Sequence, residues 1–219
     1  KVEAVGRDIG ATAFACDVSK EGDVVRLVEE TEAKIGPIDL FCSNAGIGDF
    51  THSDPNFVGA ASNDIWQRCW DVNVMSHVYA ARALVPRMAA RGGGYFLNTA
   101  SAAGLLSQIG SAVYATTKHA AVGFAEILAI THRDQGIRVS VLCPQAVDTP
   151  LLRQAGEGAQ HVDGVLTPAD VAQAVVEGLD RESFLILPHP QVIGYMRRKA
   201  DDYDRWIGGM AKFRRSLAG

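Results

Sequence analysis

Residues 95–118 read YFLNTASAAGLLSQIGSAVYATTK and decide the fold of the chain. The first residues of this stretch predict a buried strand, and the last ones predict the start of a long helix. Tyr114 and Lys118 lie four residues apart on that helix, so both side chains leave from one face. Ser101 directly follows the strand, and ligands bind at the carboxyl ends of strands in parallel α/β sheets. The stretch therefore predicts a site that combines Ser101 with the Tyr114 and Lys118 pair.

The rest of the chain alternates strands and helices. Strands are expected at 12–16, 38–42, 95–98, 139–143 and 184–187, and helices at about 20–34, 63–90, 113–133 and 168–179. Strands that are apolar on both faces, with helices between them, indicate a parallel sheet that is covered on both sides. We predict an α/β fold with a single doubly wound (Rossmann-type) sheet, in one domain over residues 1–219.

The composition excludes several classes of protein. Of the 219 residues, 47% are hydrophobic and 21% are charged, which is typical of one soluble globular domain. The net charge of −4 gives no basic surface for nucleic acid or anionic lipid. No apolar run is long enough to cross a membrane. The four cysteines form no CxxC pair, so we expect reduced thiols, no metal site and a cytoplasmic location by default.

A set of short motifs resembles the short-chain dehydrogenase/reductase family in both order and spacing. The motifs are Asn44-Ala45-Gly46, Asn73, Ser101, Tyr114-xxx-Lys118 and Pro144-xx-Val147-x-Thr149. The Tyr-xxx-Lys pattern alone is short enough to occur by chance, whereas the whole set is specific. It covers the chain from Asp17 to about Thr149. The resemblance implies a nicotinamide-dependent oxidoreductase that interconverts a secondary alcohol and a ketone or aldehyde.

The chemistry of this reaction explains why such residues are needed. Reduction of a ketone places a hydride on carbon and a proton on oxygen, but the pKa of free tyrosine is about 10. A nearby ammonium favours tyrosinate, so we expect Lys118 to lower the pKa of Tyr114. The resemblance makes Tyr114 the acid/base and places Lys118 on the nicotinamide ribose. It also implies that Ser101 binds the substrate oxygen and that Asn73 holds a relay water.

The resemblance assigns further contacts to cofactor and substrate. The expected cofactor contacts are Asp17 and Val18 at the adenine edge, Asn44, Ala45 and Gly46 along the channel, Tyr114 and Lys118 at the ribose, and Pro144, Val147 and Thr149 at the nicotinamide end. Leu106, Gln145 and Leu152 are expected to contact an apolar alcohol or carbonyl substrate. Residues 150–166 are irregular and read as a lid over that substrate. Taken alone, Asp17 could equally cap the helix that follows it.

The chain departs from the family pattern most clearly at its beginning. The glycine-rich TGxxxGxG turn, which binds pyrophosphate at a helix N-terminus, does not precede Asp17. We therefore expect a preceding segment of about 40 residues, the usual size of a βαβ unit; an intact mass equal to that of the 219 residues would contradict this. The residue that separates NAD from NADP belongs to that segment. The cofactor is NAD or NADP, with NAD favoured. Two smaller departures are Ser43 and Gln145, where the family often has asparagine and glycine.

Several alternatives stay open on the sequence. A ketoacyl-thioester reductase of the same fold would use the same residues, an inactive regulatory relative could retain them, and an epimerase or dehydratase would usually have a longer C-terminal part. The resemblance implies a homotetramer or homodimer, with the helices at 63–90 and 113–133 as expected interfaces. The tail at 195–215 reads as an amphipathic helix that is either solvated or part of a subunit contact.

Overall fold

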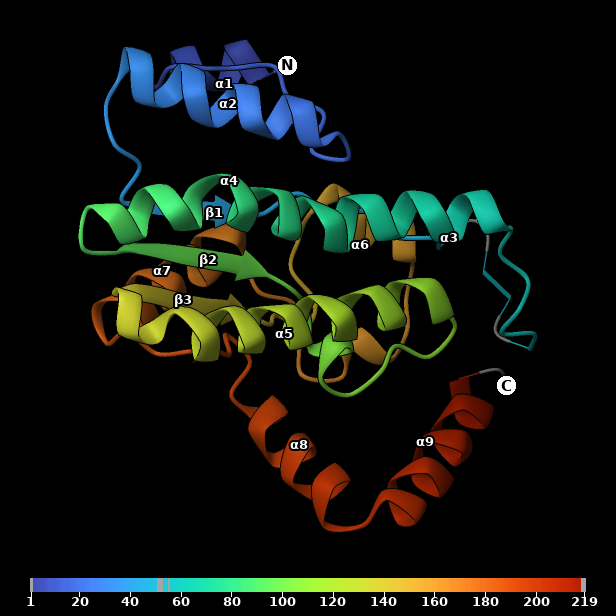
Figure 1. The fold of residues 1–219 in the computed structure, drawn as a ribbon. Helices are drawn as coiled ribbons and strands as arrows, with labels where there is room; N and C mark the ends of the chain where they lie inside the picture. The colour runs from blue at the N-terminus through green and yellow to red at the C-terminus, as the bar shows by residue number, and fades with distance from the viewer. Residues whose placement is uncertain (1, 51–52, 55, 218–219) are drawn as a thin grey trace.

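A parallel sheet of four strands organises the protein, which is described here as a computed structural model over residues 2–50, 53–54 and 56–217. The strands, in spatial order, are β1 (Leu40–Ser43), β2 (Gly94–Thr99), β3 (Ile137–Leu142) and β4 (Leu185–Ile186). Each strand pairs in parallel with the next one along the chain. Their carboxyl ends therefore meet at one edge of the sheet (Figure 1).

Helices cover both faces of this sheet, which confirms the predicted doubly wound α/β fold. The α-helices are α1 (Val2–Asp8), α2 (Glu21–Lys34), α3 (Asn63–Trp70), α4 (Ser76–Ala90), α5 (Ala112–His132), α6 (Pro150–Ala155), α7 (Pro168–Asp180), α8 (Gln191–Asp201) and α9 (Tyr203–Leu217). In Figure 1, α4 and α5 cross in front of the sheet and α7 lies behind it. Within the described ranges, no helix has both the length and the hydropathy needed to cross a bilayer.

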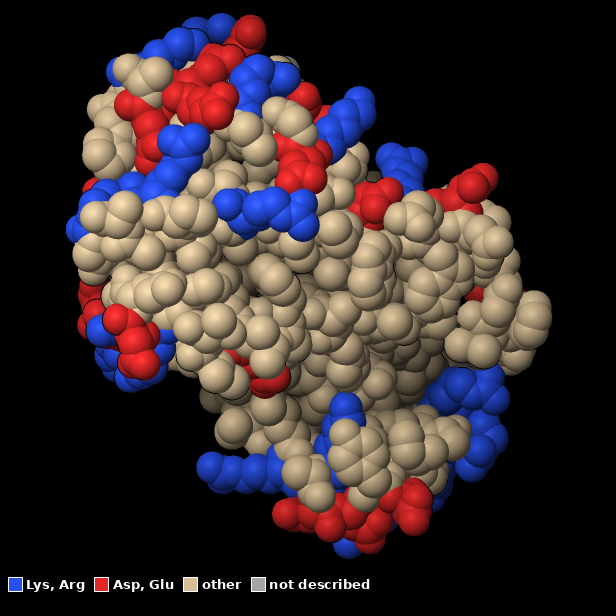
Figure 2. Space-filling model, viewed as in Figure 1, with Lys and Arg blue, Asp and Glu red and all other residues tan. Residues whose placement is uncertain are grey.

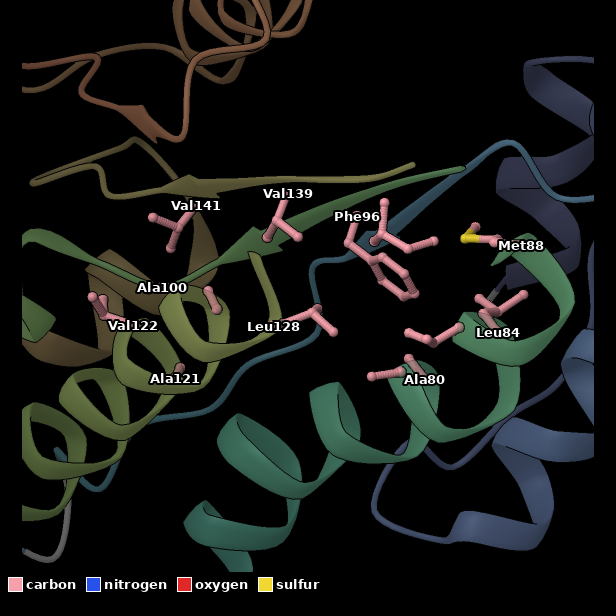
Figure 3. Close-up of a cluster of buried hydrophobic side chains, with 14 of the residues drawn as sticks. Ala80, Leu84, Met88, Phe96, Ala100, Ala121, Val122, Leu128, Val139 and Val141 are labelled. Atoms are coloured by element: carbon pink, nitrogen blue, oxygen red, sulfur yellow. The ribbon is translucent and has the colours of Figure 1, made fainter. Parts of the chain in front are cut away.

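The main core lies between β2, β3 and the helices α4 and α5 (Figure 3). Ala80, Leu84 and Met88 recur every four residues, so they form one apolar stripe on α4. Leu84 and Met88 are fully buried, and they pack in one cluster with Phe96 of β2. Neighbouring strand residues point to opposite faces, so Leu97 instead packs in the smaller cluster below α7. Alternate side chains of β2 thus pack against the helix layers on both faces of the sheet.

The long helix predicted at 63–90 is present but contains one π-helical turn. This turn, Asp71–Met75, joins α3 to α4 without a break in the helical backbone and contains Asn73. A π-turn adds one residue to a helical turn and so alters its hydrogen bonds; such turns occur often at functional sites. From the sequence we expected one continuous helix, so this turn was not predicted.

The strand predicted at 12–16 is wrong. Residues 11–16 connect α1 to α2 and form no ladder with any described strand. Strand structure requires a neighbour to accept and donate backbone hydrogen bonds, and the described sheet ends at β1. This edge position also leaves Cys42 exposed, although its apolar context predicted burial.

The C-terminal residues form a pair of helices rather than one. In Figure 1, α8 and α9 make a V below the sheet. Helix α8 is anchored by Val192, which is fully buried and packs with Ala102 and Leu106. Helix α9 has no buried residue among those described, and its Trp206 packs on the cluster around Val192.

The α4 stripe gives the first test of this architecture. Leu84→Ala should lower the free energy of unfolding by about 3 kcal/mol, because it removes buried methyl groups and leaves a cavity. Urea denaturation followed by circular dichroism measures the change. Ile35→Ala is the matched control, since Ile35 is 62% exposed and should change stability by less than about 0.5 kcal/mol. Equal losses in the two variants would contradict the packing described here.

Candidate active site

Ser101 is held in a tight turn at the carboxyl end of β2. It caps the short 3-10 helix at Ala102–Gly104, where its hydroxyl accepts a hydrogen bond from the Ala103 N–H at 3.1 Å. The hydroxyl also lies 3.4 Å from the Pro144 carbonyl oxygen, to which it donates. Gly104 makes the arrangement possible, because a Cβ there would lie 2.4 Å from the backbone oxygen of Lys118. The absence of a side chain at Gly104 thus lets the serine turn pack directly on α5.

Tyr114 and Lys118 lie one helical turn apart near the start of α5. Both are buried, and the Lys118 Nζ is 5.7 Å from the centroid of the Tyr114 ring. The ammonium donates a hydrogen bond of 3.0 Å to the carbonyl oxygen of Thr99, at the end of β2. The ring of Phe50 packs against Tyr114 with centroids 5.3 Å apart. The structure therefore brings the serine turn, the tyrosine and the lysine to one edge of the sheet.

Burial dominates the electrostatics of this site. It raises the pKa of Tyr114, and a hydrogen bond with the Ser101 side chain opposes that shift only in part. It lowers the pKa of Lys118 to about 8 and raises the pKa of Cys143, at the end of β3, to about 12. The expectation that Lys118 lowers the pKa of Tyr114 is not met in this arrangement, because the cost of burying a charged phenolate outweighs the other influences.

Asn73 lies behind these groups and joins the loop after β1 to α5. Its Oδ1 accepts from the Ile47 N–H at 2.9 Å, and its Nδ2 donates to the Ile47 carbonyl at 2.9 Å and to the Thr117 hydroxyl at 3.0 Å. A Cβ on Gly46 would lie 3.2 Å from the Lys118 Nζ and 3.5 Å from the Asn73 Oδ1. The glycine therefore allows the loop backbone to approach the ammonium closely.

A cavity of about 940 Å³ opens at this edge of the sheet. Most of the residues expected from the sequence lie in its wall: Asn44, Gly46, Ser101, Leu106, Tyr114, Lys118, Pro144, Gln145, Val147, Thr149 and Leu152. Asn73 lies outside the wall, as does the exposed Ala45. The segment predicted as a lid also contributes side chains, because Leu151, Ala155 and Val162 line the same space.

Asp17 and Val18 are not part of this wall. Asp17 accepts hydrogen bonds from the backbone N–H of Ser19 at 3.1 Å and from its hydroxyl at 2.6 Å. The backbone N–H of Asp17 donates to Asp23 at 2.9 Å. These contacts organise the turn that precedes α2; Asp17 does not cap the helix, because the N-cap residue is Lys20 and it has no side-chain cap hydrogen bond.

The sequence reasoning missed one wall of the cavity. Trp206, Met210 and Phe213 of α9 line it, and they recur at i, i+4 and i+7 on one helix face. That stripe was visible in the sequence, but nothing in the pattern identified what it covers. Figure 2 shows a largely uncharged surface that is hollowed beside the C-terminal helix pair. Across the cavity, Gln108 donates a hydrogen bond of 2.9 Å to Gln160 and joins two of the covering loops.

Comparison with known proteins decides the family. The profile described as short chain dehydrogenase matches residues 1–160. The chain belongs to the short-chain dehydrogenase/reductase family. The resemblance drawn from the motifs is thereby confirmed, and the protein is an oxidoreductase that acts on CH–OH groups with a nicotinamide cofactor.

Individual relatives support the same assignment. A 1-deoxy-11-beta-hydroxypentalenate dehydrogenase of Streptomyces exfoliatus is 33% identical over 215 residues, which cover 94% of this chain and 74% of the relative. The human epidermal retinol dehydrogenase 2 is 27% identical over 198 residues, which cover 88% of this chain and 62% of that enzyme. A short chain dehydrogenase/reductase from Burkholderia phymatum, solved in complex with NAD, superposes with a TM-score of 0.78 at 27% identity and covers 93% of this chain and 80% of its own.

The contact between the serine turn and α5 can be tested on this dehydrogenase without any substrate. Gly104→Ala should lower the free energy of unfolding by about 1–3 kcal/mol, because its Cβ would overlap the Lys118 carbonyl. Gly123→Ala on α5 is the control: a Cβ there meets nothing within 4 Å, and helix propensity should stabilise it by up to about 1 kcal/mol. Thermal and urea unfolding of both variants measure the difference. A neutral Gly104→Ala would mean that the turn does not rest on α5.

Proposed function

We propose that this dehydrogenase interconverts a secondary alcohol and a ketone or aldehyde, with Tyr114 as the group that moves the proton. One observation carries the proposal: Ser101, Tyr114 and Lys118 lie together in the wall of a single, mainly apolar cavity. Apolar surroundings strengthen hydrogen bonds and charge interactions at the reacting oxygen. A ketoacyl-thioester reductase would use the same three residues, and an inactive relative could retain them, so turnover assays must separate these alternatives.

In the direction of oxidation, the substrate hydroxyl gives its proton to the Tyr114 oxygen. Ser101 turns its one O–H from the Pro144 carbonyl to the substrate oxygen and so holds that oxygen beside the tyrosine. The nicotinamide cofactor, when bound, supplies the hydride acceptor or donor for the substrate carbon. Tyr114 must be deprotonated to act as a base, and burial opposes this. The ammonium of Lys118 lies 5.7 Å from the centroid of the Tyr114 ring, and its positive charge must offset part of the cost of burial when the substrate is bound.

The described residues fit a nicotinamide cofactor at the edge of the cavity. Lys118 has three N–H donors, and the Thr99 carbonyl accepts one of them, so donors are available for ribose hydroxyls. A Cβ on Gly46 would crowd that ammonium at 3.2 Å, so the glycine lets the loop backbone pass close to the proposed ribose site. We propose that Asn44, Ala45 and Gly46 line the cofactor channel and that Pro144, Val147 and Thr149 contact the nicotinamide end. Asp17 and Val18 would contact the adenine edge.

We favour NAD over NADP, supported by the NAD complex of the B. phymatum relative. The substrate we propose is an apolar alcohol or carbonyl compound, bound among Leu106, Leu152 and Gln145 beneath the lid at 150–166. The names of the two relatives above also denote dehydrogenases of hydroxyl compounds. A cytoplasmic homotetramer or homodimer completes the proposal.

Replacement of the tyrosine tests the acid/base role. Tyr114→Phe keeps the ring but removes the hydroxyl, so kcat should fall by about 10²- to 10⁴-fold, the usual contribution of a general acid or base. The measurement is turnover of the full-length protein with NAD or NADP and a panel of secondary alcohols and ketones. Tyr203→Phe is the control, because Tyr203 is 58% exposed on α9. Unchanged turnover in Tyr114→Phe would remove the tyrosine from the mechanism, and absence of both turnover and cofactor binding in the parent would favour a regulatory relative.

Replacement of the lysine tests the cofactor site. Lys118→Met should weaken binding of NAD by about 10- to 100-fold, because it removes charged hydrogen-bond donors. In the parent, affinity should fall as pH rises through about 8, since the ammonium is lost above its pKa of about 8. Calorimetric titration between pH 6.5 and 9.5 measures both effects. Lys34→Met, at an exposed lysine paired with Glu30, should bind like the parent. If the affinity of the parent protein for NAD does not change with pH in this range, Lys118 is not the cofactor-binding ammonium.

A further inference from the structure

Two polar side chains behind Lys118 have buried atoms without hydrogen-bond partners. They are His77, near the start of α4 and just beyond the π-turn, and Asn98 of β2. Each is 1% exposed. Among the described residues, neither ring nitrogen of His77 nor the Nδ2 of Asn98 has a partner. Buried polar atoms are normally paired with protein or with internal water, because an unpaired one destabilises the fold. We therefore expect these atoms to bind a small polar molecule, such as an internal water.

The surroundings of His77 connect it to the active site. The Asn98 side chain and the Asn73 backbone face its ring, and the charge of Lys118 acts on it. Burial, and then that charge, lower the pKa of His77 to about 4, so the ring is neutral at pH 7. A neutral imidazole offers one N–H donor and one unprotonated nitrogen that accepts. At the pH of catalysis, His77 is thus available as a hydrogen-bond acceptor beside an ammonium.

Lys118 has a donor for such an acceptor, and its third N–H is still left for a ribose hydroxyl. Its ammonium carries three N–H donors, and the Thr99 carbonyl is its one hydrogen-bond acceptor among the described residues. Because the imidazole is neutral, it does not cancel the positive charge that Lys118 offers to the cofactor. A single water between His77, Asn98 and Lys118 would satisfy the Asn98 Nδ2 and the unprotonated ring nitrogen of His77, since a buried water typically makes about three hydrogen bonds.

We propose that His77 and Asn98 bind an internal water against Lys118, which makes His77 a positioning residue for the lysine ammonium. The water accepts hydrogen bonds from the Asn98 amide and from Lys118, and it donates one to the unprotonated nitrogen of His77. No proton needs to be transferred for this role. The inference rests on the proposed function only in giving the ammonium a part in the reaction.

The sequence offers a structural reason for the cluster in this chain. Ser43 stands where the family often has asparagine, and it pairs in register with Asn98 across β1 and β2. Register partners in a parallel sheet project from the same face, so the shorter serine leaves more space beside the Asn98 amide. The other titratable groups around the cluster are Tyr114 on α5 and Cys143 after β3, and burial raises the pKa of both.

The decisive experiment compares His77→Phe with His77→Gln. Phenylalanine fills the space but cannot accept a hydrogen bond, so the ammonium loses an acceptor and the pKa of Lys118 should fall by about one unit. The alkaline limb of kcat should move to lower pH by the same amount, giving about tenfold lower kcat at pH 9 and nearly parental kcat at pH 6.5. Glutamine keeps an acceptor and should restore the parental profile.

The pKa of Lys118 can be read without turnover, by NMR of protein labelled with carbon-13 at lysine Cε. The Lys118 signal is identified by its loss in Lys118→Met. Asn98→Leu should shift this pKa in the same direction, and the double variant should shift it by less than the sum, because both residues hold one water. His132→Phe, on the exposed end of α5, is the control and should change nothing.

The outcomes separate this inference from the proposed function. A folded His77→Phe or Asn98→Leu protein with the parental Lys118 pKa and pH profile would overturn the inference, even if Tyr114→Phe abolishes turnover. A shifted pKa that glutamine restores supports the water site even in a protein for which no substrate is found. If His77→Phe does not fold, Asn98→Leu and His77→Gln carry the test, and a high-resolution crystal structure without a water between these side chains would overturn it.

Discussion

An ammonium buried at the end of a parallel sheet is the constraint on which the candidate active site depends. A charged group in a dry site needs oxygen acceptors nearby, and the end of β2 supplies one in the Thr99 carbonyl. The neighbouring elements are shaped around the same charge. Gly46 brings the loop after β1 close to it, and Gly104 lets the Ser101 turn rest on the backbone of Lys118. The Lys118 residue thus meets the Ser101 turn through its backbone and the loop after β1 through its ammonium.

The two glycines illustrate how the fold and the chemistry share one geometry. Both lie in loops that follow strands, where side chains are usually tolerated. Here a Cβ would collide with a carbonyl in one case and crowd an ammonium in the other. The π-turn at Asp71–Met75 acts in a similar way, because it carries Asn73 into the gap between the loop after β1 and α5. Small changes in backbone geometry, rather than additional charged groups, assemble the site.

Much of this arrangement could be predicted from the sequence. The alternation of apolar strands with helices gave the sheet, and the four-residue spacing of Tyr114 and Lys118 placed both in the cavity wall. The helix predicted at about 168–179 is also present as α7, and it begins with a capping motif in which the Asp170 carboxylate accepts from the Thr167 N–H at 2.9 Å. The strand at 12–16 was wrong because a strand depends on a partner that local sequence does not show. His77 and the α9 wall were missed for the same reason: their roles come from contacts between distant segments.

The serine turn has a further consequence for protein engineering. Because Gly104 fixes the turn directly on α5, the geometry of Ser101 and Tyr114 does not depend on the loop between them. Residues 107–110 can then be viewed as a replaceable segment over the cavity, tied to the opposite loop by the hydrogen bond between Gln108 and Gln160, whereas Leu105 and Leu106 pack in the cluster that anchors α8. Loops of other length or polarity could be grafted between the serine turn and the start of α5 to change which molecules fit in the cavity. The frame around the buried ammonium would stay as it is.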